Sequence, residues 1–125
     1  MRDAPTIRAA RQRIRDVCLE LPVVVAKDVR QHTKFTVKTK AFCYFLVDHH
    51  GDGMLGVVVK TRDGENEQMV RNDPQRFYSP AYVGPKGWVG IRVDVNPVPW
   101  ENVATLVEDS YRLVAPRSLV RRIGS

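Results

Sequence analysis

The densest group of side chains that could carry chemistry is the run His49-His50-Gly51-Asp52, which brings two imidazoles and a carboxylate together. Such groups can bind a metal ion or exchange protons near neutral pH. Neighbouring residues of a strand point to opposite faces, so one ion would need an irregular turn to contact both histidines. Asp52-Gly53 is also a dipeptide that tight connections favour. We therefore expect a turn without a metal ion, and His32 has no ligand at a suitable spacing.

Motifs of catalysis and cofactor binding provide no further candidate. The chain has no nucleophile elbow, no phosphate-binding Gly-Lys-Ser loop and no dinucleotide fingerprint. We therefore predict no catalytic residues and no cofactor, and we expect a binding module rather than an enzyme.

Basic side chains are the next group with a functional meaning. The 125 residues include 20 Lys and Arg against 14 Asp and Glu, which gives a net charge of +6. This balance favours anionic partners and solubility, although generic surface charge also explains it. Several cations occupy strand positions that would face away from the core, namely Lys34, Lys38, Lys60 and Arg92.

The same strand parity includes residues that suit a ligand surface. Gly56 and Gly90 would leave the sheet low beneath a ligand, and Tyr44 with Trp88 would offer rings on which exposed bases stack. Such a face could contact phosphates without reading sequence. The alternative is the solvated side of a one-faced sheet, with both glycines at β-bulges.

An N-terminal helix is the first element expected to support these groups. Thr6 is its expected N-cap and Pro22 follows its expected end. Arg8, Arg11 and Arg15 lie beside its apolar stripe, either as a solvated flank or in support of phosphate contacts. The stripe itself consists of Ile7, Ala10, Ile14, Val17, Cys18 and Leu21.

Strands with alternating or nearly continuous apolar residues follow. Thr39-Lys40 should join two of them in a hairpin, although it lacks the Asn-Gly pair of a tight turn. Asp63 is expected to cap a short helix that continues to Arg71. The strands are expected at Val23–Val29, Phe35–Lys38, Ala41–Val47, Met54–Lys60 and Trp88–Val95.

A second amphipathic helix should follow Pro97 and Pro99, and Pro116 separates it from a basic tail. Glu108 and Arg112 would form an outward pair on it. Its expected buried stripe is Val103, Leu106, Val107, Ser110, Tyr111 and Val114. Short links favour antiparallel strands, and helices can cover one sheet face. We predict an α+β fold, a two-layer sandwich with helices on one face, as a single domain over residues 1–125.

Cysteines and apolar runs bear on the location of the protein. Cys18 and Cys43 stand in apolar patterns without metal-ligand spacing, so we expect small buried thiols. The Arg-rich segment Met1–Arg15 lacks the apolar run of a secretory signal, and no stretch reaches the ~18 apolar residues of a membrane span. We expect a cytoplasmic monomer with no membrane partner.

The segment Asn72–Asp94, which reads NDPQRFYSPAYVGPKGWVGIRVD, carries a family resemblance. WENV at Trp100–Val103 and DSYRLVAP at Asp109–Pro116 continue it, and HTKF at His32–Phe35 and KAF at Lys40–Phe42 precede it. Together these segments resemble the MmcQ/YjbR family, small bacterial proteins often described as DNA-binding. The resemblance covers nearly the whole chain.

This resemblance implies an α-β-β-β-α-β-β-α sandwich, related to frataxin-like and secretion-chaperone-like folds, and DNA contact through β-hairpin wings. Family members usually carry a Gly and then an acidic residue after Leu21-Pro22, where this chain has Val23–Val25. Iron binding of the frataxin type needs an acidic helix ridge. The first helix here instead carries Arg8, Arg11, Arg13 and Arg15.

The leading hypothesis is a module that contacts DNA phosphates through a basic sheet face and hairpin tips. Gly84–Gly87 would be one tip, which either presents Lys86 or serves to bury Trp88. The alternative is an adaptor for a protein or small ligand around Trp88, using Phe77, Tyr78 and Tyr82, although such clusters also form cores. The residues expected to contact nucleic acid are Lys34, Lys38, Lys40, Lys86, Trp88, Arg92, Arg8, Arg11 and Arg15.

Overall fold

The structure, a computed structural model, describes residues 4–124. Its helices are α1 (Ala4–Leu19), α2 (Glu65–Asn72), α3 (Trp100–Val114) and α4 (Arg117–Arg122), and its 3-10 turns are η1 (His49–Gly51) and η2 (Gly84–Lys86). Its strands are β1 (Val24–Val29), β2 (His32–Val37), β3 (Lys40–Val47), β4 (Leu55–Lys60), β5 (Phe77–Tyr78) and β6 (Trp88–Arg92). Within the described part of the chain, no helix is long and apolar enough to cross a membrane.

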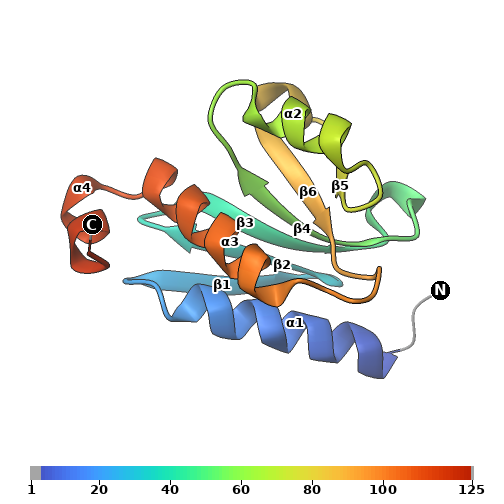
Figure 1. The fold of residues 1–125 in the computed structure, drawn as a ribbon. Helices are drawn as coiled ribbons and strands as arrows, with labels where there is room; N and C mark the ends of the chain where they lie inside the picture. The colour runs from blue at the N-terminus through green and yellow to red at the C-terminus, as the bar shows by residue number, and fades with distance from the viewer. Residues whose placement is uncertain (1–3, 125) are drawn as a thin grey trace.

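All strands join one antiparallel sheet in the order β1-β2-β3-β4-β6-β5. α1 contacts β1 and β3, α3 contacts β3 and β4, and α2 contacts β5 and β6. These helices lie together on one side of the sheet (Figure 1). The predicted two-layer α+β class is therefore confirmed. Four strands precede α2, one more than the resemblance implies, because the segment after η1 pairs with β3 as a further strand.

The hydrophobic core lies between the sheet and the two long helices. Phe35 and Ile91 face it from the strands and Val107 faces it from α3, each at most 1% exposed. Full burial of such a side chain stabilises the fold by about 1.5–3 kcal/mol. Cys18 and Cys43 are fully buried free thiols in this layer, as predicted.

Two buried hydroxyl groups of α3 form hydrogen bonds to β3 and to the segment between α1 and β1. The Ser110 hydroxyl donates to the Phe42 carbonyl at 2.6 Å, and the Tyr111 hydroxyl donates to the Pro22 carbonyl at 2.7 Å. Both side chains belong to the buried stripe predicted for this helix, and both are buried. The predicted ion pair between Glu108 and Arg112 also forms, at 3.3 Å.

Element boundaries differ from expectation at several points. Thr6 lies inside α1 rather than at its N-cap, because the proline before it is accommodated in the first helical turn. Gly64, with a left-handed φ of 79°, is the N-cap of α2 in place of Asp63. β6 ends at Arg92, and although Val93 still donates to the Leu55 carbonyl at 3.0 Å, the chain bends from there on. The basic tail forms α4, an unanticipated helix, and buries Leu119 in the core.

Several connections use left-handed backbone without glycine. Lys38 (φ 49°) and Thr39 (φ 68°) form the whole connection between β2 and β3, since Val37 pairs with Lys40. A two-residue hairpin turn of this kind requires positive φ at both positions, which costs a non-glycine residue about 1–2 kcal/mol. The non-glycine residues with positive φ are Val23, Arg30, Lys38, Thr39, Asp48, His50 and Tyr82.

Candidate functional site on the open sheet face

The sheet surface opposite the helices, called the open face here, has a cationic edge and an aromatic centre. The rings of Tyr44 and Trp88 lie 5.7 Å apart between centroids. Lys34 is the direct partner of Tyr44 across β2 and β3. The sequence thus correctly placed these three side chains on one face. A row of directly paired residues crosses the whole sheet in the order Lys27, Lys34, Tyr44, Val58, Gly90 and Tyr78.

Tyr78 fills the space above the two glycines of this face. A Cβ added at Gly90 would lie 2.6 Å from Tyr78 Cε2, and one added at Gly56 would lie 3.0 Å from Tyr78 Cζ and closer still to the hydroxyl oxygen. β4 and β6 pair there in regular register. The expectations of a low ligand surface and of β-bulges are therefore both wrong, because the glycines accommodate a neighbouring ring. Burial raises the pKa of Tyr78, so its phenol stays protonated at neutral pH.

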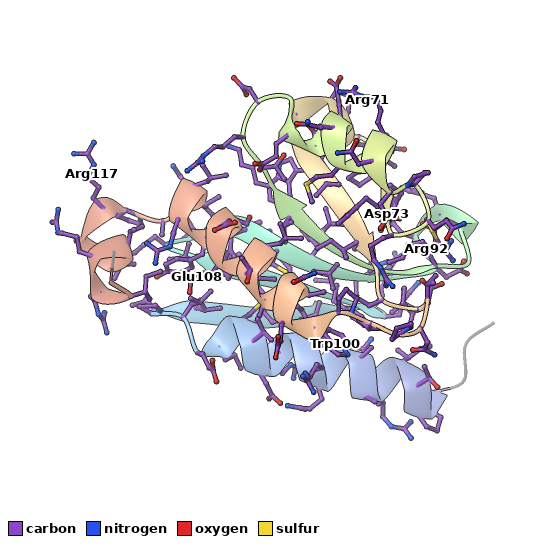
Figure 2. The ribbon with its side chains drawn as sticks, in the orientation of Figure 1. Arg71, Asp73, Arg92, Trp100, Glu108 and Arg117 are labelled. Carbon is purple, nitrogen blue, oxygen red and sulfur yellow. The ribbon has the colours of Figure 1, made fainter. Side chains whose placement is uncertain are left out.

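Arg92 lies on β6 and is engaged within the protein. Its Nε and Nη2 donate to the carboxylate of Asp94 at 3.1 and 2.9 Å, and the Asp94 side chain is 0% exposed. Arg92 extends from the end of β6 near the connection to α3 (Figure 2). These hydrogen bonds raise the pKa of Arg92 further. The guanidinium thus balances a buried carboxylate before any ligand arrives.

The arginines predicted on α1 lie on the helix side of the sheet. Arg15 forms an ion pair with Asp28 at 2.6 Å, and the Arg11 guanidinium lies 5.4 Å from the centroid of the Phe45 ring, which is part of the core. Arg8 is exposed on the same helix. The structure therefore does not bring these three arginines together with the lysines of the open face.

The remaining predicted cations lie on the open face or at one end of it. Lys38 lies in the β2–β3 turn and Lys40 follows it at the start of β3, while Lys86 precedes β6 at the same end of the sheet. All three are exposed. Within residues 4–124, neither they nor Lys34 take part in an ion pair. Lys38 belongs to the turn itself, so its predicted position on the strand face is wrong.

The tip that carries Lys86 is held by a buried amide. Asn66 Nδ2 of α2 donates to the carbonyls of Gly84 at 2.9 Å and Trp88 at 3.3 Å. Gly87 takes a left-handed φ of 91° and returns the chain to β6. Trp88 is half-buried while Lys86 is exposed. The two interpretations of this tip, presentation of a lysine and burial of the tryptophan, are therefore compatible.

The aromatic residues near Trp88 do not form one cluster. Phe77 pairs with Ile91 and lines the space between α2 and α3. Tyr78 covers the glycines of the open face. Tyr82 is 78% exposed and lies apart from them, with its ring 5.4 Å from that of His50. These residues therefore do not provide the shared aromatic surface that the adaptor hypothesis requires.

A cavity of about 430 Å³ lies between the open face and the segment Pro80–Val83. Aliphatic and aromatic side chains form most of its wall. Sequence reasoning missed it, because the cavity exists only where an irregular segment folds back over its own sheet. The lining residues are Val29, His32, Thr33, Lys34, Tyr44, Leu46, His49, Val58, Pro80, Ala81, Tyr82 and Val83.

The histidines meet at the edge of this cavity. The rings of His32 and His49 lie 5.4 Å apart, and those of His49 and His50 lie 4.1 Å apart. His32 Nδ1 accepts a hydrogen bond from the Val47 N–H at 3.0 Å, which fixes that nitrogen as unprotonated. Burial lowers the pKa of His32 and of His49, so both are neutral at pH 7. Across residues 4–124, His, Cys, Asp and Glu form no group of three that could hold a metal ion.

Comparison with known proteins identifies relatives of this fold. The structure is similar to the crystal structure of the Deinococcus radiodurans protein DR2400, which has a DUF419 domain. The TM-score is 0.68 at 24% sequence identity, over 89% of this chain and 85% of that one. No curated protein matches the sequence. The family model described as YjbR matches residues 19–113, and the chain therefore belongs to the YjbR family.

Proposed function

We propose that this protein is a non-catalytic module that contacts single-stranded nucleic acid with its open face and the adjoining hairpin tips. The observation that carries the proposal is a set of lysines without carboxylate partners among the described residues, which lie on the open face and at the end of the sheet where Trp88 begins β6. The lysines are Lys34, Lys38, Lys40 and Lys86, and the aromatic rings of the open face are Tyr44 and Trp88.

Phosphate contact explains why cations occupy strained turns. Lys38 and Arg30 stand at left-handed positions in the two hairpin turns that flank β2, where Asn or Gly would lower the energy. Such strain is retained most often where a side chain serves a function. A lysine at a hairpin tip can reach a phosphate without a requirement for any particular base.

Base stacking explains the aromatic centre of the face. Tyr44 and Trp88 are half-buried, so one side of each ring packs on the sheet while part of it remains accessible. Stacking of an exposed base on such a ring contributes about 1–3 kcal/mol and tolerates any base. A duplex keeps its bases stacked on one another and offers mainly its phosphates. We therefore expect single strands to bind more tightly than duplexes.

Fluorescence anisotropy of a labelled single-stranded oligonucleotide of mixed sequence tests the proposal, with the matching duplex as comparison. If the protein neutralises four phosphates of the single strand, log K should fall with log salt at a slope of about −2.8 between about 50 and 200 mM salt. Absence of binding at the lowest salt, or binding that ignores salt, contradicts the proposal.

Paired variants locate the contact. Lys38→Ala with Lys40→Ala removes two positive charges from the β2–β3 hairpin tip and should flatten the slope by about 1.4. Arg8→Ala with Arg71→Ala removes two charges from the helix side, where Arg71 extends from α2 (Figure 2), and should leave the slope nearly unchanged. Equal flattening in both pairs would show that net charge alone matters. Arg92 is unsuitable for this test, because its removal would also take a guanidinium partner away from the buried Asp94 carboxylate and destabilise the fold.

A further inference from the structure

The cavity beneath Pro80–Val83 has the composition of a small-molecule site. Its floor is the aliphatic part of the open face, with Leu46 and Val58, and its roof is the segment Pro80–Val83. A volume of about 430 Å³ is within the range of sites that enclose small organic ligands. Such sites combine apolar walls with a few polar groups that orient the ligand. Here the cationic lining group is Lys34.

The charge at the mouth of the cavity favours an anion. Lys27 and Lys34 are direct cross-strand partners, and like charges in that arrangement repel. The carboxylate nearest in sequence, Asp28, faces the other way, since it accepts a hydrogen bond from Thr33 at 2.7 Å and one from Arg15 at 2.6 Å. The cavity lining includes no Asp or Glu. A ligand carboxylate would therefore reduce the repulsion between the Lys27 and Lys34 ammonium groups, which no ion pair among the described residues offsets.

Tyr82 supplies a second, independent observation. It has a left-handed φ of 69° and is 78% exposed, so the backbone is strained and a large ring lies in water. Its ring lies 5.4 Å from the His50 ring, at the histidine edge of the cavity. A bulky residue at such a φ is an outlier that points to a function. An apolar ligand in the cavity would allow the Tyr82 ring to pack against it and become less exposed to water.

The polar groups of the cavity select against a nucleobase. The Thr33 hydroxyl points to the helix side of the sheet, where it donates to Asp28, and His32 Nδ1 already accepts from the Val47 N–H, so neither group is free for a ligand in the cavity. The several donors and acceptors of a base edge would thus be buried with few partners, which costs binding free energy. An aromatic body without polar groups on its ring avoids this cost, and Tyr44 and His49 offer edge contacts to it.

We propose that this cavity binds an aromatic carboxylate, with the carboxyl group at the Lys34 ammonium and the ring on Leu46 and Val58 beneath Pro80–Val83. The site does not depend on nucleic acid binding. It would make the protein a receptor for a small acid, whatever else its open face contacts.

Isothermal titration calorimetry with benzoate, 3-phenylpropanoate and 1-naphthylacetate, each against its neutral primary amide, tests the proposal. At least one acid should bind, and it should bind about ten-fold more tightly than its amide, because a charge-assisted hydrogen bond to Lys34 is lost in the amide. Lys34→Met should reduce the affinity for the acid to that of the amide. If none of the three acids binds at about 10 mM, their dissociation constants are too high for a specific site. That result would overturn the proposal.

Surface variants keep the test independent of folding. Ala81 lines the cavity and is exposed, so Ala81→Glu should fold, repel the acid and weaken its binding about ten-fold, whereas the isosteric Ala81→Gln should not. Lys40→Met, at the other end of the sheet, should leave acid binding unchanged. Acid binding that is unchanged in both the Glu and the Gln variant would place the ligand elsewhere and overturn the proposal. The Lys38 and Lys40 alanine pair tests only nucleic acid binding, so the two proposals fail separately.

Discussion

Packing of Tyr78 on the glycines of the open face allows a quantitative prediction. A Cβ at Gly90 would overlap the Tyr78 ring, whose Cε2 would lie 2.6 Å away, closer than Cβ contacts occur in proteins. The ring cannot move toward the sheet, so Gly90→Ala must displace it. Overpacking of this kind costs about 1–3 kcal/mol of unfolding free energy.

A double-mutant cycle isolates this effect. With Tyr78→Ala the obstacle is gone, and Gly90→Ala should then stabilise the strand by about 0.5–1 kcal/mol, because alanine loses less backbone entropy than glycine. The coupling between the two positions should therefore be about 1.5–4 kcal/mol. Urea unfolding of the four proteins, followed by circular dichroism, measures it. An equal cost of Gly90→Ala in both backgrounds would refute the packing described here.

Three further predictions concern backbone strain and ionisation. Val23→Gly should raise the unfolding free energy by about 1 kcal/mol, since Val23 has φ 61° and is 49% exposed; a loss of stability would contradict the strained backbone. Lys38→Asn with Thr39→Gly should raise the thermal midpoint and weaken oligonucleotide binding; loss of both would indicate misfolding. Hydrogen bonds lower the pKa of Asp28 below 3.8, so its stabilisation is present above that pH and lost as pH falls through the folded-state pKa. The unfolding free energy of Asp28→Asn should therefore fall less steeply at acidic pH than that of the native protein. An equal fall in both proteins would refute the link between Asp28 ionisation and stability.

The sequence predicted the architecture well because its periodic segments match their burial. The alternation around Phe35 and the stripe that includes Val107 both identify the covered side of the sheet, and both side chains are buried there. The family resemblance agreed with this fold and is confirmed by the YjbR match. Turn chemistry was harder to predict. Lys38-Thr39 and Val23 use left-handed backbone that their residue types disfavour. Local preferences therefore placed the β2–β3 turn one residue late, and they did not predict the left-handed backbone at Val23.

The site was predicted only in part, because side-chain parity does not reveal what a distant segment places on a face. Lys34, Tyr44 and Trp88 share the open face as their strand phases implied. Nothing in the local pattern of Gly56 or Gly90 shows that Tyr78 would occupy the space above them. The cavity likewise depends on a loop that returns to its own sheet. The helical spacing of α1 placed its arginines beside the apolar stripe. Only the contacts of Arg11 with Phe45 and of Arg15 with Asp28 show that these two arginines lie on the helix side of the sheet.

The most direct test of the central claim is the salt dependence of single-stranded oligonucleotide binding in three proteins. The native chain should give a slope of about −2.8 in log K against log salt, as expected for four phosphate contacts on a single strand. The slope of the Lys38 and Lys40 alanine pair should be flatter by about 1.4, and that of the Arg8 and Arg71 alanine pair should match the native slope. A native protein that does not bind at low salt, or two variant pairs with the same reduced slope, would contradict an open face that contacts nucleic acid.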